Sequence, residues 1–156
     1  MNSNTLEDLK INVKIKLSAL WITLMFCYSY ADVLGFYSPG NLAEILTGEI
    51  AGVPLTQEML FAMAIMMALP ILMVILSLLL KPKVNRPLNI VIGMFQIVIL
   101  FATFLNTITA YYIVLAGIEF VCLVMIIWFA FRWPVQGNLT EIPTSEIAGV
   151  PYEVVK

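Results

Sequence analysis

The chain has 156 residues, of which 62% are hydrophobic and only 12% are charged. Because a soluble domain carries about 25% charged residues, this composition excludes an ordinary soluble protein and indicates a membrane protein. The formal net charge is −2, and the sequence has no basic cluster of the kind that binds nucleic acid.

Four continuous apolar runs occupy most of the sequence, at about residues 15–36, 59–80, 88–108 and 111–133. Each approaches the ~20 residues that an α-helix needs to cross about 30 Å of hydrocarbon. Lipid leaves backbone polar groups without partners, so these non-alternating runs predict helices as the spanning structure. The last two runs must be separate helices, because one helix from Leu88 to Trp133 would be about 69 Å long.

The loop between the first two runs has the pattern of a short amphipathic helix. Ser38 and Pro39 suit a helix N-cap and first position, and Gly52 with Pro54 would end the helix. Apolar residues recur between them at helical spacing, at Leu42, Ile45, Leu46 and Ile50. We expect this helix to lie on the outer membrane surface or to cap the bundle. The predicted fold is therefore an all-α, single-domain bundle of four transmembrane helices over residues 1–133, with a tail over 134–156.

The positive charges give the orientation of this bundle. All eight Lys and Arg residues fall on one side of a four-pass layout, at Lys10, Lys14, Lys16, Lys81, Lys83, Arg86, Arg132 and Lys156. Because Lys and Arg concentrate in cytoplasmic loops, we expect both termini in the cytoplasm of a cell whose inner membrane holds the protein.

An internal repeat joins the outer loop to the tail. Residues 40–54 read GNLAEILTGEIAGVP and residues 137–151 read GNLTEIPTSEIAGVP, so twelve of fifteen positions are identical. Pro143 replaces Leu46, so the second copy cannot form the same uninterrupted helix. The favoured interpretation is a duplication with little function. The alternative, in which the tail docks on an equivalent surface of another subunit, conflicts with a topology that places the copies on opposite sides.

Each predicted helix has one face with more polar or small residues, which we expect to point into the bundle. These faces comprise Ser18, Trp21, Met25, Tyr28 and Asp32; Met63, Met67, Pro70 and Ser77; Asn89, Gly93, Gln96, Thr103 and Thr107; and Tyr112, Ala116, Glu119 and Cys122.

Two carboxylates lie inside the predicted membrane spans. Asp32 falls roughly 6 Å below the outer boundary and Glu119 about 12 Å below it, at 1.5 Å per residue. The sequence offers no Lys, Arg or His at that depth, and an unpaired ionised carboxylate in hydrocarbon is costly. The candidate polar or ion site comprises Glu119, Asp32, Tyr28, Gln96 and Tyr112.

Three interpretations of this site remain open. The favoured one is interhelical hydrogen bonding, in which a protonated Glu119 bonds to a Tyr hydroxyl or Gln amide. The second is the binding of a proton or cation, and the third is a polar ligand such as a lipid head group or a quinone. No metal site, cofactor or catalytic group is predicted, because the chain has no His, no Cys-x-x-Cys pair and no nucleotide-binding loop.

Several motifs together resemble a family of small bacterial four-pass membrane proteins of unknown function. They are Lys16–Trp21, Tyr28–Asp32, Tyr37–Gly40, Asn85–Asn89 and Tyr111-Tyr112. The likeness covers about residues 10–134 and implies the fold and a bacterial inner membrane, but no activity. We therefore expect a non-enzymatic subunit that forms homo-oligomers or joins a membrane-protein partner. The alternative is a small proton- or cation-coupled transporter or channel that uses the intramembrane carboxylates.

Overall fold

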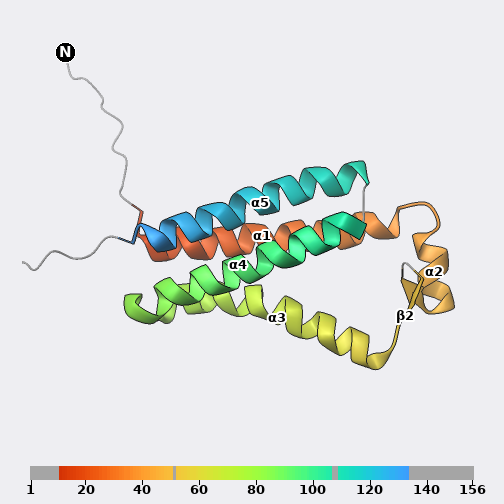
Figure 1. The fold of residues 1–156 in the computed structure, drawn as a ribbon, viewed down its shortest axis with the longest axis horizontal. Coiled ribbons are helices and arrows are strands. Elements are labelled where there is room, and N and C mark those ends of the chain that lie inside the picture. The colour runs from red at the N-terminus through yellow and green to blue at the C-terminus, as the bar shows by residue number, and fades with distance from the viewer. Residues whose placement is uncertain (1–10, 51, 107–108, 134–156) are drawn as a thin grey trace, which may run out of the picture.

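The structure, a computed structural model, describes residues 11–50, 52–106 and 109–133, and Figure 1 shows four long helices running along the molecule. They are α1 (Val13–Phe36), α3 (Gln57–Leu79), α4 (Pro82–Asn106) and α5 (Ala110–Phe131). All four are long and apolar enough to cross a membrane. The predicted fold class is therefore confirmed, whereas the repeated sequence at 137–151 lies outside the described residues.

Helix α4 begins at Pro82, six residues before the predicted start at residue 88. Proline is favoured in the first turn of a helix, because the amide hydrogen it lacks has no partner there. Residues 82–87, which lie between two predicted helices, are thus the first turns of α4, and Asn85 belongs to this helix. The starts of α1 and α3 agree more closely with the predicted starts at residues 15 and 59. Asn12 is the N-cap of α1, and Thr56 is the N-cap of α3.

A small unit joins α1 to α3, and it differs from the predicted single helix. It consists of α2 (Asn41–Thr47) and a hairpin of two short antiparallel strands, β1 (Glu49–Ile50) and β2 (Val53–Pro54). Gly40, not Ser38, is the N-cap of α2, and Gly48 ends it with φ of 85°, in the left-handed region that glycine adopts easily. None of the residues of α2 is buried, which favours a position at the membrane surface over one that caps the bundle.

The packing order of the helices is α4, α5, α1, α3. Helix α1 packs between α5 and α3, and α4 packs against α5. Helix α3 meets α4 near their connection and diverges from it towards α2 (Figure 1). Pro70 is buried inside α3, where it removes a backbone hydrogen bond. Residues 60–66, before this proline, are exposed, so the prediction that Met63 faces inward is wrong: it is 41% exposed.

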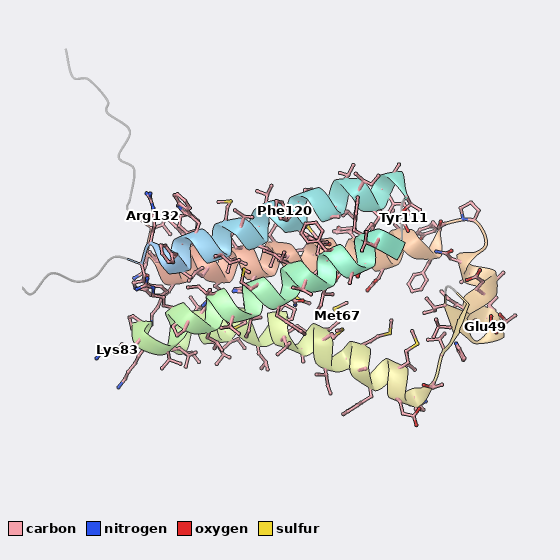
Figure 2. All side chains as sticks on the ribbon, in the orientation of Figure 1. Glu49, Met67, Lys83, Tyr111, Phe120 and Arg132 are labelled. Atoms are coloured by element: carbon pink, nitrogen blue, oxygen red, sulfur yellow. The ribbon has the colours of Figure 1, made fainter. Side chains whose placement is uncertain are left out.

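Charged side chains separate to the two ends of the bundle. Lys16 lies over the ring of Phe129, and Arg86 lies over that of Phe131. Figure 2 shows Lys83 and Arg132 at this same end, and Glu49 at the other. We call them the basic end and the acidic end. The arrangement agrees with the charge asymmetry from which the sequence analysis derived an orientation.

A hydrogen-bonded cluster of polar side chains joins three helices near the basic end. The Trp21 indole donates to Asn89 Oδ1 at 2.8 Å, and Ser77 Oγ donates to the same oxygen at 3.3 Å. Asn89 Nδ2 donates to Asn85 Oδ1 at 2.6 Å. Trp21, Ser77, Asn85 and Asn89 are all completely buried. We call these four residues the Asn89 cluster; in it α1, α3 and α4 share one acceptor oxygen.

Neighbouring bonds satisfy the C-terminal end of α3. The last four carbonyl groups of a helix have no partner within it. Asn85 Nδ2 donates to the Ser77 carbonyl at 2.6 Å, and Lys14 Nζ donates to the Leu78 carbonyl at 3.1 Å. The positive charge of Lys14 also lies at the negative end of the α3 dipole. These two bonds allow α3 to end inside the bundle and reverse into α4 within two residues.

We predict that Asn89→Ala lowers the free energy of unfolding by about 1–3 kcal/mol, because Trp21 and Ser77 lose their shared acceptor inside a buried site. The measurement is unfolding in detergent with increasing dodecyl sulfate, followed by tryptophan fluorescence. Thr23→Ala is the matched control, since Thr23 is exposed and donates only to Ala19 of its own helix. Equal stability of the two variants would contradict a central role for Asn89.

The glycines of α4 and α5 allow a second, paired test. A Cβ atom at Gly93 would lie 3.1 Å from Ile127 Cγ1, whereas one at Gly117 would meet nothing within 4 Å. Gly93→Leu should therefore separate α4 from α5 and lower the free energy of unfolding by about 1–3 kcal/mol. Gly117→Leu should change it by less than about 0.5 kcal/mol. The same dodecyl sulfate titration reports both, and a similar loss in each would show that α4 and α5 do not pack closely at Gly93.

Candidate functional site

Glu119 lies near the middle of α5 and points into the bundle. It is 3% exposed, although the helix around it is almost entirely apolar. At 1.5 Å per residue it is about 14 Å from Ala110 and about 18 Å from Phe131, the two ends of the helix. A carboxyl group at this depth of a membrane-spanning helix is energetically costly, and such residues commonly have a function.

The structure brings most of the predicted site residues together around Glu119. Its carboxyl group lies within electrostatic range of Asp32, Tyr28 and Tyr112. Tyr28 and Tyr112 are half-buried, and Asp32 is exposed. The buried thiols of Cys27 and Cys122 are also within this range. Among the described residues, the titratable side chains near Glu119 come from helices α1 and α5.

Gln96 is buried like Glu119 but lies at a different level of the bundle. The antiparallel helices α4 and α5 meet at Phe101 and Phe120, whose ring centroids are 6.2 Å apart. Gln96 lies five residues before Phe101, about 8 Å nearer the basic end along the helix axis. The structure therefore does not bring Gln96 level with the carboxylates.

Glu119 has no hydrogen-bond donor among the described residues, whereas the Asn89 cluster is fully bonded. Among these residues, the only completely enclosed side-chain nitrogen or oxygen atom without a partner is Thr109 Oγ1. The Glu119 oxygens therefore still touch space outside the chain. Side-chain hydrogen bonds join the long helices at the Asn89 cluster, at Lys14, and at Ser18, whose Oγ donates to the Val74 carbonyl at 2.9 Å; Glu119 makes none of them.

The residues of the Asn89 cluster were only partly identified from sequence. Trp21, Ser77 and Asn89 lie on the predicted inward faces, whereas Asn85 falls between the predicted helices 59–80 and 88–108. Its position four residues before Asn89, which places both on one helix face, was the available signal.

The described residues hold no group of three or more His, Cys, Asp or Glu side chains that could bind a metal ion. The two carboxylates near the site have tyrosine hydroxyls and thiols as their titratable neighbours. The chemistry that these groups can support is hydrogen bonding and the exchange of a proton.

The model of one protein family matches the chain over residues 6–140. It is described as a family of unknown function, DUF6326. The match begins slightly before, and ends slightly after, the part of the sequence that carries the recognisable motifs. No match is found among curated proteins or among solved structures.

We predict that Glu119→Gln changes the free energy of unfolding by less than about 0.5 kcal/mol, and that Glu119→Leu is neutral or stabilising, because no hydrogen bond is lost. Asn89→Leu, at a bonded position of the adjacent helix, is the matched comparison and should be clearly destabilising. A loss above about 2 kcal/mol for Glu119→Gln would assign this residue to interhelical hydrogen bonding.

Proposed function

The protein belongs to this family of unknown function, and we propose from its own geometry that it is a membrane transporter or channel that conducts protons, in which Glu119 binds the proton. The observation that supports this proposal is a carboxyl group at mid-membrane depth that is 3% exposed and has no hydrogen-bond donor among the described residues. Interhelical bonding, the competing role, requires a hydrogen-bond partner on another helix.

A proton suits the site better than a metal cation. Hard cations such as Ca²⁺ and Mg²⁺ take six or more oxygen ligands. The charged or titratable oxygens near Glu119 are those of Asp32, Tyr28 and Tyr112, and Asp32 lies towards the exposed end. A proton needs one acceptor oxygen, and binding it removes the cost of an ionised carboxylate in hydrocarbon.

The proposal includes the placement of the protein in the membrane. The basic end would face the cytoplasm of the cell and the acidic end the outside of the inner membrane. The separation of Lys and Arg from Glu44, Glu49 and Glu58 supports this placement. Four transmembrane helices are few to surround a pore, so self-association of the chain would be part of the transport mechanism.

The test is proton flux into vesicles that contain the purified protein and a trapped pH-sensitive dye. We expect an imposed pH gradient to collapse faster than in empty vesicles, and Glu119→Gln to return the rate to that of empty vesicles. Glu58→Gln is the matched control, because Glu58 lies in the exposed first turn of α3 and should leave the flux unchanged. Wild-type flux in the Glu119→Gln vesicles would contradict the proposal.

A non-enzymatic accessory or oligomer-forming subunit is the second candidate, and the outer half of α3 favours it. Leu60, Phe61, Met63, Ile65 and Met66 are all exposed there. Flexible methionine side chains adapt to varied partner surfaces. Under this candidate, the Glu119→Gln protein has unchanged flux, and wild-type protein extracted from its membrane retains a stoichiometric protein partner.

A further inference from the structure

We infer that the conformation described here opens Glu119 to the acidic end alone, through Tyr28, Tyr112 and Asp32, and closes it to the basic end. This inference rests on the proposed function. It states from which end of the bundle Glu119 takes up and releases its proton. It follows from how burial changes along α1 and α5 on either side of Glu119.

Contacts between α1 and α5 show which residue of α1 lies at the same height along the bundle axis as Glu119. Lys16 Nζ lies 5.3 Å from the centroid of Phe129, and Gly35 lies beside the Tyr111 hydroxyl at the opposite end. The helices are antiparallel, so Glu119 falls level with Cys27. Towards the basic end from Glu119, α5 continues for about 18 Å.

A packed apolar core blocks the route to the basic end. Leu24, Leu123 and Ile126 follow Glu119 in this direction and are completely buried, as are Leu17 and Met73. The Trp21 indole donates its hydrogen to Asn89, so it is already engaged. Gln96 lies at this level too, but a carboxamide neither releases nor takes up a proton near neutral pH. The buried thiol of Cys122 lies one turn from Glu119 in this direction. Beyond it, neither residues 17–26 of α1 nor residues 123–131 of α5 include a titratable side chain, so a proton relay towards the basic end stops at Cys122.

Oxygen atoms lead the other way, from Glu119 to the acidic end. Tyr112 precedes Glu119 by seven residues on the same face of α5, about 10 Å along the axis. Tyr28 and Asp32 share a face of α1 and are about 6 Å apart along it. Exposure increases along α1 in this direction, from buried Cys27 through half-buried Tyr28 to exposed Asp32, and Tyr112 of α5 is half-buried.

The step is a simple proton exchange. A hydronium ion at the acidic end gives its proton to the Asp32 carboxylate or directly to a tyrosine-bound water, and becomes water. The proton then reaches the Glu119 carboxylate, which becomes a neutral carboxylic acid. Reversal returns the proton to water on the same side, so no electron or other co-reactant is needed.

The titratable groups that face Glu119 come from two helices. They are Cys27, Tyr28 and Asp32 from α1, and Tyr112 and Cys122 from α5. The described parts of α3 and α4 contribute none at this depth, since their charged residues lie in their terminal turns. The carbonyl stretch of a protonated carboxyl group that Glu119→Gln abolishes therefore reports on this site.

The experiment measures that infrared band in vesicles of known protein orientation. Glu49→Cys places a reactive thiol at the acidic end, while Cys27 and Cys122 are only 6% exposed. An impermeant biotin–maleimide reagent then separates vesicles with the acidic end outward from those with it inward. After an external acid step, we expect the Glu119 band to rise at once in the first population. In vesicles with the acidic end inward, the band should rise only at the slow rate of net proton flux. In vesicles with the acidic end outward, Asp32→Asn should slow the rise of the band.

Two results would overturn the inference in distinguishable ways. An equally fast rise in both populations means that Glu119 is open to both ends, which removes the sidedness and leaves the proposed function standing. No Glu119-dependent band after acidification of detergent-solubilised protein, where both ends meet the same solution, means that Glu119 takes up no proton, and the proposed function fails as well.

Discussion

Polar groups inside hydrocarbon must find their partners within the protein, and this constraint organises the molecule. Asn89 meets it for three helices at once: its side-chain oxygen accepts from Trp21 of α1 and Ser77 of α3, while its own amide donates to Asn85. Asn85 and Lys14 then satisfy carbonyl groups at the end of α3. The short turn from α3 to α4, and the position of α1 between α3 and α5, depend on these bonds.

The two halves of the bundle meet this constraint differently. Near the basic end the Asn89 cluster is hydrogen-bonded and the apolar side chains around it are packed, so this half holds α1, α3 and α4 together. Towards the acidic end α3 diverges beyond Pro70, and the buried carboxyl group of Glu119 has no donor among the described residues. An arrangement that is fixed at one end and open at the other suits a site that exchanges a proton with one side at a time. The same divergence exposes the apolar residues of α3 on which the accessory-subunit candidate rests.

Sequence patterns predicted the fold well where the physics is local. Span length, charge asymmetry and helix periodicity gave the four helices, and they placed Trp21, Asn89, Ala116 and Cys122 on inward faces that are buried. The patterns failed where contacts with a neighbouring helix decide whether a residue is buried or helical. Periodicity assigns Met63 to the inward face of α3, yet it cannot show that α3 leaves the bundle there. The hydropathy of residues 81–87 suggests a loop, but Pro82 and a bond from Asn85 to Ser77 make this segment helical.

Water is expected to reach Glu119 from the acidic end and not to pass the apolar core between Glu119 and the basic end. Solid-state nuclear magnetic resonance with polarisation transferred from water, in a lipid bilayer, tests this most directly. The account predicts early transfer to Asp32, Tyr28 and the Glu119 carboxyl carbon, and none in the same time to Leu123 and Ile126. Transfer that reaches Leu123 as early as Glu119, or that never reaches Glu119, would contradict it.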